Sequence, residues 1–169
     1  MDVEIRRLEA RDTVVIAAAF TAIGWNKPVA QYERYLREQE QGSRVVLAAL
    51  VGGLFAGYLC VVWQPGYPLF RERGIPEIQD FNVLPQFRRK GIGSRLMESA
   101  EQLAAERSPI AGIGVGMTAD YGAAQRLYVL RGYVPDGLGL VSGNKPLVYG
   151  ELVTIDDDLV LHFTKSVAD

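Results

Sequence analysis

The chain of 169 residues contains one cysteine and one histidine, so two kinds of site chemistry have almost no residues to draw on. Cys60 alone cannot form a disulfide within the chain, which fits a reducing compartment such as the cytoplasm. Cys60 and His162 both lie in strand-like stretches, and no metal-ligand spacing surrounds either residue. We interpret both as structural residues, and the sequence predicts no metal site.

A strong net charge and long apolar runs are also missing. The formal charge is −2, whereas a nucleic-acid-binding protein usually has a basic face and a high pI. No apolar run approaches the roughly 20 residues that span a bilayer. The first residues, MDVEIRRLEARD, lack the apolar core of a signal peptide. No repeat or flexible linker divides the chain. We therefore expect a cytoplasmic protein with no nucleic-acid or membrane partner, and one domain over residues 1–169.

Hydrophobic patterns predict a mixed α/β fold with helices on both faces of a sheet. Gly52-Gly53 between two β-rich runs predicts a hairpin, residues 64–74 are expected to form an irregular loop, and Asp120 is expected to cap a helix. The predicted strands are Val3–Leu8, Arg44–Val51, Leu54–Trp63, Glu77–Val83, Ile110–Met117, Tyr133–Leu140, Leu147–Val153 and Leu159–Thr164. The predicted helices are Arg11–Ile23, Val29–Gln41, residues 92–108 and residues 120–130.

The most informative stretch is Asp80–Leu96, which reads DFNVLPQFRRKGIGSRL. A strand ending at Val83 is followed by a basic, glycine-containing turn that opens into an amphipathic helix. Backbone N–H groups at a helix start have no intrahelical acceptor, and the helix dipole adds partial positive charge. The stretch therefore predicts a pyrophosphate-binding cradle. Its residues are Arg88, Arg89, Lys90, Gly91, Ile92, Gly93 and Ser94.

Two other phosphate-binding motifs do not match this stretch. A P-loop requires Gly-x-x-x-x-Gly-Lys-Ser/Thr, which is absent. A dinucleotide-binding fingerprint requires a third glycine at the position of Leu96. A solvated basic helix start without any ligand is the remaining alternative.

Two motifs together resemble the GCN5-related N-acetyltransferase (GNAT) superfamily. The first is residues 88–93, RRKGIG, which matches Arg/Gln-x-x-Gly-x-Gly/Ala. The second is residues 124–133, AQRLYVLRGY, which matches Ala-x-x-Leu-Tyr-x-x-x-Gly-Phe/Tyr. The resemblance implies a mixed, mostly antiparallel sheet of about seven strands. It also implies acetyl-CoA as acyl donor and a primary amine of a small molecule or peptide as acceptor, and it makes a homodimer an expected assembly.

The resemblance also implies roles for residues near the second motif. Tyr128 would protonate the leaving thiolate, because a phenol is a donor at neutral pH. Ala124, on the same helical face, would leave room for the cofactor. Tyr121 stands where many family members have asparagine, so Tyr121 or Asp120 would replace that cofactor contact. The backbone N–H of Val83 would stabilise the oxyanion.

An alkylamine with a pKa of roughly 10.4 arrives protonated at neutral pH, so a base is useful. Glu77 matches the position of the base in the histone-acetyltransferase branch, and Asp80 is the rival. Strand alternation places the two on opposite faces unless a bulge intervenes, so only one is expected to line the site.

Two further questions stay open at the level of the sequence. Gly112, Gly114 and Gly116 alternate along one strand, which indicates either the approach of a ligand or close packing against bare backbone. The chain is either an N-acetyltransferase that works by direct attack in a ternary complex, or a non-catalytic acyl-CoA-binding or sensing module. Turnover with an amine would distinguish the two.

Overall fold

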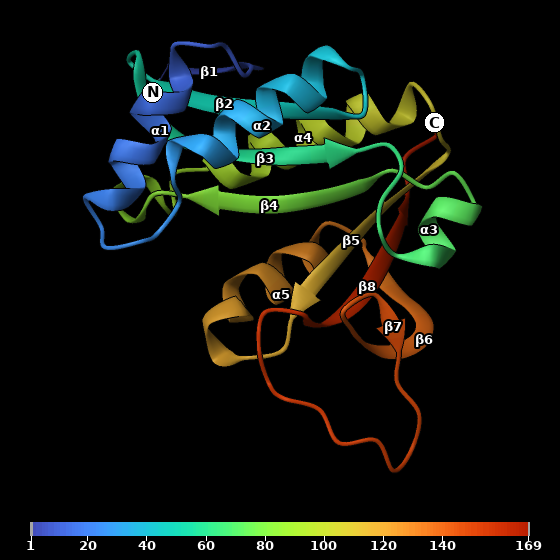
Figure 1. Ribbon diagram of the computed structural model, residues 1–169. Helices are drawn as coiled ribbons and strands as arrows, with labels where there is room; N and C mark the ends of the chain where they lie inside the picture. The colour runs from blue at the N-terminus through green and yellow to red at the C-terminus, as the bar shows by residue number, and fades with distance from the viewer. Residues whose placement is uncertain (1, 169) are drawn as a thin grey trace. The chain divides into compact units, whose positions relative to one another are not determined.

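The computed structural model describes residues 2–168 and shows a mixed α/β fold with an eight-stranded, mostly antiparallel sheet (Figure 1). Hydrogen bonding orders the strands β1-β2-β3-β4-β5-β8-β6-β7, and the pairing of β4 with β5 is parallel. None of the helices within residues 2–168 combines the length and apolar character that a membrane crossing requires. The strands are β1 (Val3–Arg7), β2 (Arg44–Val51), β3 (Leu54–Val62), β4 (Glu77–Val83), β5 (Ile110–Gly116), β6 (Val134–Ser142), β7 (Lys145–Pro146) and β8 (Leu159–Ser166). The helices are α1 (Asp12–Thr21), α2 (Val29–Glu40), α3 (Pro68–Glu72), α4 (Ile92–Ala105) and α5 (Gly122–Leu130), with short 3-10 turns η1 (Pro85–Phe87) and η2 (Ala119–Tyr121).

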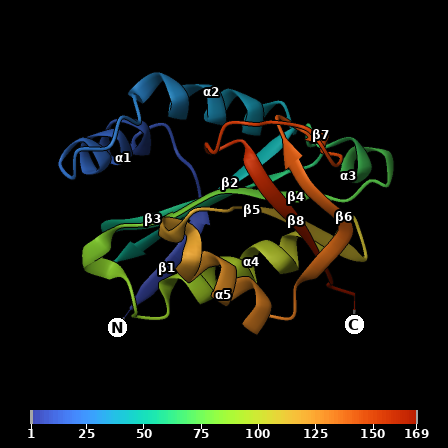
Figure 2. The same cartoon turned by 90° about the horizontal axis from the view of Figure 1, so that it is seen from below.

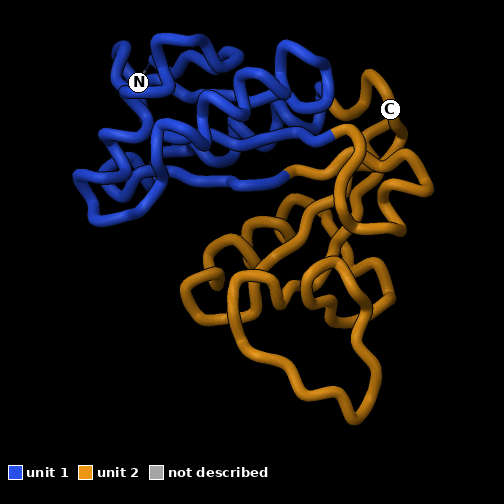
Figure 3. Tube along the Cα trace, viewed as in Figure 1, with its two compact units in different colours: residues 1–62, 79–103 blue, residues 63–78, 104–169 orange. Residues whose placement is uncertain are grey.

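The chain divides into two compact units (Figure 3). Unit 1 contains residues 1–62 and 79–103, and unit 2 contains residues 63–78 and 104–169. Strand β4 begins in unit 2 and ends in unit 1, so the two predicted base residues, Glu77 and Asp80, belong to different units.

In unit 1, β1, β2 and β3 form an antiparallel meander with α1 and α2 on one face and α4 on the other (Figure 2). The β2–β3 turn is Gly52-Gly53, as predicted, and both residues have positive φ (54° and 80°). Fully buried Phe20, Tyr32 and Tyr58 lie in the core beneath α1 and α2. In α2 the buried aromatic residues are three positions apart, which places them on the same face of the helix.

In unit 2, β5, β8 and β6 are antiparallel neighbours, with Gly114 opposite His162 in the β5–β8 register. The alternating glycines of β5 are explained by packing. A Cβ on Gly112 would lie 2.3 Å from the Phe70 ring, and one on Gly116 would lie 2.4 Å from the Tyr121 ring. Side chains of unit 2 therefore occupy the space above this strand, which confirms close packing as a reason for these glycines.

The structure corrects three predictions from the sequence. Residues 64–74 are not only a loop, because Pro68 starts the short helix α3, whose Phe70 is buried against Tyr67 and the bare backbone at Gly112. Asp120 does not cap α5; it lies in η2 and accepts a hydrogen bond from the Thr118 hydroxyl.

The predicted strand Leu147–Val153 is also wrong. Its apolar side chains are largely exposed, so they have no sheet face to cover. The Glu151 carboxylate accepts hydrogen bonds from the Val148 backbone N–H (2.8 Å) and from Lys145 Nζ (3.1 Å), which closes a local turn in place of a strand.

Replacing Gly112 by alanine should destabilise the protein by about 1–3 kcal/mol, because the new methyl group overlaps the buried Phe70 ring. Gly122→Ala is the matched control. Its Cβ would meet nothing within 4 Å and its φ is −56°, so stability should stay unchanged or rise by about 0.5–1 kcal/mol. Urea unfolding of both variants measures the difference, and equal stabilities would show that Phe70 yields without cost.

Candidate active site

The predicted cradle lies in unit 1 between the end of β4 and the start of α4. Gly91 has φ +77° and Arg89 has φ +56°, so the backbone turns sharply before the helix begins. Arg95 N donates to Gly91 O at 3.1 Å, which is the first hydrogen bond of α4. The N–H groups of Gly91, Ile92 and Gly93 precede that bond and have no carbonyl one turn earlier to accept them. This geometry fits a pyrophosphate group.

Three cations lie in this turn, and all three side chains are exposed. Arg88 Nε donates to the backbone carbonyl of Val83 at 3.0 Å, so Arg88 also fixes the turn against the end of β4. The Lys90 ammonium lies 5.7 Å from the centre of the Phe87 ring. Exposed cations attract a polyanion without paying a large desolvation cost, since their charges are already in water.

Close packing against β4 also explains why position 93 of the motif is a glycine. A Cβ at this position would lie 3.1 Å from the Phe81 ring of β4. The first turn of α4 therefore approaches β4 closely, which brings its N–H groups to the end of the strand that carries Val83. Ser94 lies in the same first turn and is exposed.

Tyr128 is buried in α5 of unit 2 and is 4% exposed. Burial raises the pKa of its phenol, so the group stays protonated throughout the neutral range. The centres of the Tyr128 and Tyr133 rings are 6.1 Å apart. At neutral pH the phenol can therefore donate a proton but cannot accept one, and the role of Tyr128 in the reaction stays a prediction.

Tyr121 precedes the first residue of the same helix, and Ala124 lies in its first turn. The Tyr121 ring covers the bare backbone at Gly116, and its hydroxyl donates to Asp157 at 2.7 Å. Gln125 Nε2 donates to the Gly116 carbonyl at 2.9 Å. The start of α5 is thus tied to the end of β5, and Ala124 is partly exposed there.

Glu77 has a partner that sequence reasoning missed. Its Oε1 lies 3.4 Å from Nε2 of His162, and the two side chains are 8% and 2% exposed. They lie above Gly114, where a Cβ would be 3.2 Å from His162 Nε2 and 3.5 Å from Glu77 Oε1. Tyr67 stacks on the imidazole with ring centres 3.8 Å apart. Glu77 and His162 are far apart in the sequence and meet only through the pairing of the strands. No local sequence pattern therefore predicts this pair.

Asp80 has different surroundings in unit 1. Its carboxylate accepts hydrogen bonds from Tyr58, Tyr35 (3.0 Å), Gln31 (3.1 Å) and Asn82 (2.9 Å), and forms an ion pair with Lys27 at 2.8 Å. Burial by itself would raise the pKa of Asp80, but Lys27 and the hydrogen bonds outweigh it and hold the pKa below its usual value. The residue has φ +48°, so regular strand alternation is interrupted here.

Cys60 is a free thiol in the core of unit 1. Burial raises its pKa to about 12, so the reactive thiolate is absent at neutral pH. This agrees with a structural role.

The predicted residues fall into two groups. The cradle, Val83 and Asp80 belong to unit 1, whereas Glu77, Tyr121, Ala124 and Tyr128 belong to unit 2.

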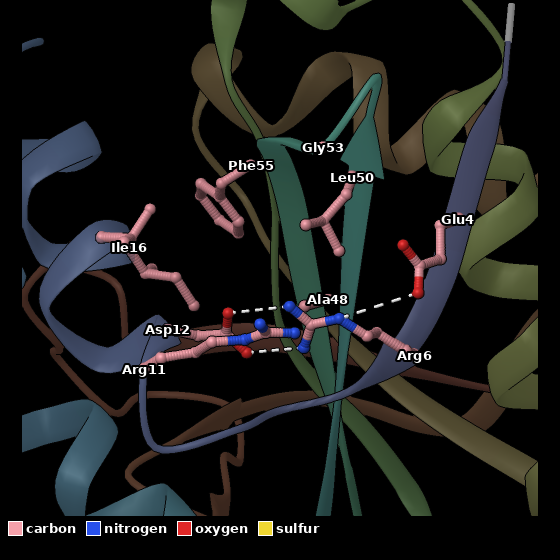
Figure 4. A pocket seen from close by; sticks show the side chains of 10 residues that line it. Glu4, Arg6, Arg11, Asp12, Ile16, Ala48, Leu50, Gly53 and Phe55 are labelled. Carbon is pink, nitrogen blue, oxygen red and sulfur yellow. Dashed lines mark hydrogen bonds and ion pairs between the residues drawn. The ribbon is translucent and has the colours of Figure 1, made fainter.

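Unit 1 also has an open pocket of about 390 Å³ beside β1 and α1 (Figure 4). Arg6 and Asp12 pair across it through two hydrogen bonds of 2.7 and 2.9 Å, next to apolar Leu50 and Phe55. None of the residues predicted for cofactor binding or catalysis lines this pocket. Because the Arg6 guanidinium and the Asp12 carboxylate already pair with each other, we assign this pocket no role in cofactor binding or catalysis.

Comparison with known proteins shows the family to which the chain belongs. Residues 6–133 match the sequence model of the Acetyltransferase (GNAT) family. An uncharacterized N-acetyltransferase of Archaeoglobus fulgidus is 32% identical over 95 residues, which cover 54% of this chain and 61% of that relative.

Solved structures share the fold over nearly the whole chain. Ard1 from Thermoplasma volcanium has a TM-score of 0.72 at 21% identity and covers 100% of both chains. YncA from Salmonella typhimurium, solved with its cofactor acetyl-CoA, has a TM-score of 0.69 at 16% identity, covering 99% of this chain and 95% of that chain.

A mixed sheet whose central strand leads through a glycine turn into a helix start is the arrangement expected of a protein that holds a phosphorylated cofactor. The chain belongs to the GNAT acetyltransferase family. Acetyl-CoA is the cofactor of that family, which confirms the predicted cofactor at the level of the family.

Proposed function

We propose that residues 1–169 act as one domain that transfers the acetyl group of acetyl-CoA to a primary amine of a small molecule or peptide. The observation that carries this proposal is the cradle at the start of α4, where Gly91 turns the backbone and Gly93 brings the helix against β4. The family match over residues 6–133 and the fold match over the whole chain support it.

In the proposed reaction the free amine attacks the thioester carbon directly. The base first takes one proton from the ammonium form of the acceptor. A C–N bond then forms, the C–S bond breaks, the leaving thiolate takes a proton from Tyr128, and the second proton lost by the nitrogen restores the Tyr128 phenol through solvent. The Val83 backbone N–H is proposed to stabilise the oxyanion. Cofactor contacts are proposed for Val83, Tyr121, Ala124 and the cradle residues 88–94.

The surroundings of the two candidate bases favour Glu77 over Asp80. Asp80 is held ionised by Lys27 and by four neutral donors, so protonating it would break an established network. Glu77 faces the imidazole of His162 at 3.4 Å, and not an ammonium group as Asp80 does. We propose Glu77 as the base, acting directly or through water.

A non-catalytic acyl-CoA-binding module is the second candidate, favoured by one observation. Tyr121 stands where many family members have asparagine, and its hydroxyl is bonded to Asp157. A sensing module would bind acetyl-CoA and show no turnover with any amine.

A cytoplasmic location and a homodimer also stay predictions. Cell fractionation measures the location, and light scattering measures the assembly.

Calorimetric titration with acetyl-CoA tests the cradle, with ATP and NAD as control ligands. We expect acetyl-CoA alone to bind tightly. If ATP or NAD bound as well as acetyl-CoA, or if acetyl-CoA did not bind, the proposed ligand would be wrong.

The double variant Arg89→Gln/Lys90→Gln should weaken acetyl-CoA binding about tenfold at low salt, which corresponds to about 1.4 kcal/mol. The effect should shrink as salt rises, because exposed charges are screened. Arg71→Gln/Arg73→Gln removes two exposed cations at the end of α3 and is the matched control, with no change in affinity expected. Equal losses in both variants would mean that net charge, and not the cradle, sets the affinity.

A further inference from the structure

Lys27 lies in the irregular segment between α1 and α2, yet its ammonium group points into the protein. Its Nζ lies 2.8 Å from Asp80 Oδ1 and 3.1 Å from the Tyr58 hydroxyl. The rings of Phe20 and Tyr58 stand 5.4 and 5.6 Å from Nζ, measured to the ring centres. A carboxylate, a phenol oxygen and two aromatic faces around one nitrogen are the groups that recognise an alkylammonium ion. We call this set of residues (Phe20, Tyr58 and Asp80) the ammonium cage.

The walls of the cage do not depend on Lys27. Phe20 belongs to α1, Tyr58 to β3 and Asp80 to the part of β4 that lies in unit 1. Asp80 also keeps Tyr35 and Gln31 of α2 and Asn82 of β4 as donors. Without Lys27 the carboxylate would stay oriented and hydrogen-bonded, but its negative charge would be largely buried without a counter-ion. Such a site attracts a cation.

The cage also lies on the strand that carries the proposed oxyanion donor. Asp80 precedes Val83 by three residues in β4, and both belong to unit 1. A ligand group held in the cage is therefore held beside the strand end where the acetyl transfer is proposed to occur.

We propose that the ammonium cage is a binding site for a primary alkylammonium group of the acceptor, and that Lys27 occupies it as a resident, displaceable stand-in. This inference rests on the proposed function for the identity of the ligand as acceptor, whereas binding to the cage does not depend on catalysis.

The chemistry of the cage also narrows the class of acceptor. An ammonium paired with an ionised carboxylate keeps its proton and has no lone pair for attack on a thioester. The caged nitrogen is therefore an anchor, and a second amino group of the same molecule is the nucleophile. The acceptor class is a molecule with two amino groups, such as a linear diamine or a peptide with two amines.

Thermal unfolding of Lys27→Ala with n-propylammonium chloride, without acetyl-CoA, tests the cage. We expect the Tm of this variant to rise by about 3 °C or more once the ligand reaches about ten times its Kd. n-Propanol, and tetramethylammonium chloride at the same ionic strength, should have a much smaller effect, because the first has no charge and the second has no N–H donor.

Matched variants separate the cage from general ion effects. Lys27→Met removes the same charge but keeps the side-chain volume, so it should gain little from propylammonium. Lys27→Ala/Asp80→Asn should lose the gain, and Lys145→Ala, which breaks an exposed ion pair with Glu151, should show none. Equal shifts in Lys27→Ala and Lys27→Met, or no shift specific to propylammonium, would overturn the proposal.

A measurement on the wild-type chain keeps the proposal testable if Lys27→Ala does not fold. With lysine labelled by ¹³C at Cε, the Lys27 signal should be displaced in the free protein by the ring currents of Phe20 and Tyr58, with Lys27→Arg used for assignment. Adding 1,4-diaminobutane should move that signal to the position of a solvent-exposed lysine. A signal that does not move at concentrations that saturate turnover would show that Lys27 is a fixed clamp.

The two proposals fail in different ways. If no amine supports turnover while propylammonium still stabilises Lys27→Ala, the proposed function is wrong and the cage stands. If diamines and monoamines of equal length turn over equally and the Tm does not shift, the proposed ammonium-binding site is wrong, and the proposed acetyltransferase function is unaffected.

Discussion

Tyr128→Phe should lower kcat by about 10²- to 10⁴-fold, the range in which a positioned general acid contributes, and should leave the Kd for acetyl-CoA almost unchanged. The substitution removes one hydroxyl group from a buried ring and preserves its packing in α5. Stopped-flow or steady-state detection of the released thiol measures kcat, and calorimetry measures Kd.

The burial of Tyr128 also leads to a prediction about the pH dependence of the rate. Because burial raises the pKa of the phenol, the donor stays protonated up to the ordinary tyrosine pKa. The wild-type rate should therefore show no alkaline loss from Tyr128 below pH ~10, the reference pKa of a tyrosine. Tyr133→Phe is the matched control, since it removes a hydroxyl from the neighbouring buried ring. A drop in kcat of the same size in both variants would assign the effect to packing and not to proton donation.

Local patterns in the sequence predicted most of the fold. The hairpin at Gly52-Gly53, the helix after the glycine turn and the strand that ends at Val83 each depend on residues close together in the chain. The turn before α4 also follows from local residues, since Gly91 with positive φ lets the backbone turn there, while its role as a cradle stays a prediction.

The parts that sequence reasoning missed depend on distant contacts. The His162 imidazole meets the Glu77 carboxylate only because β4, β5 and β8 are neighbours and Gly114 leaves space between the two side chains. The Lys27–Asp80 ion pair joins residues 53 positions apart. Residues 147–153 show the converse error, because an apolar stretch forms a strand only where a neighbouring strand exists to pair with it.

The pairing of Asp80 with Lys27 has a consequence for stability. The pKa of Asp80 is lowered in the folded protein, so the unfolded chain takes up a proton at this residue before the folded chain does. The stability that Asp80 contributes is therefore complete above the ordinary aspartate pKa and is lost as the pH falls through the lowered value. Asp80→Asn should remove this acid-sensitive part, because an amide has no charge to lose.

Glu77→Gln should reduce kcat about 10²-fold or more at neutral pH, and the defect should shrink as the pH rises. An alkylamine acceptor has a pKa near ~10.4, so its unprotonated fraction grows about tenfold per pH unit between 7 and 10. A base that removes the ammonium proton matters less as that fraction grows. The ratio of wild-type to variant kcat/KM, measured from pH 7 to pH 10 with one amine, therefore reports the role of Glu77.

Two further variants distinguish a role of Glu77 as the base from a structural role in its contact with His162. His162→Gln disturbs the contact with Glu77 but keeps the carboxylate, so it should lower stability more than it changes the slope of the pH profile. Asp80→Asn should alter KM for the amine more than the pH profile, since Asp80 is already committed to Lys27 and to its hydrogen-bond donors. A Glu77→Gln defect that stays constant from pH 7 to pH 10 would contradict the role of Glu77 as base. In that case Glu77 would act by holding His162 and β5 in place, and the proton would leave the amine through water or another group.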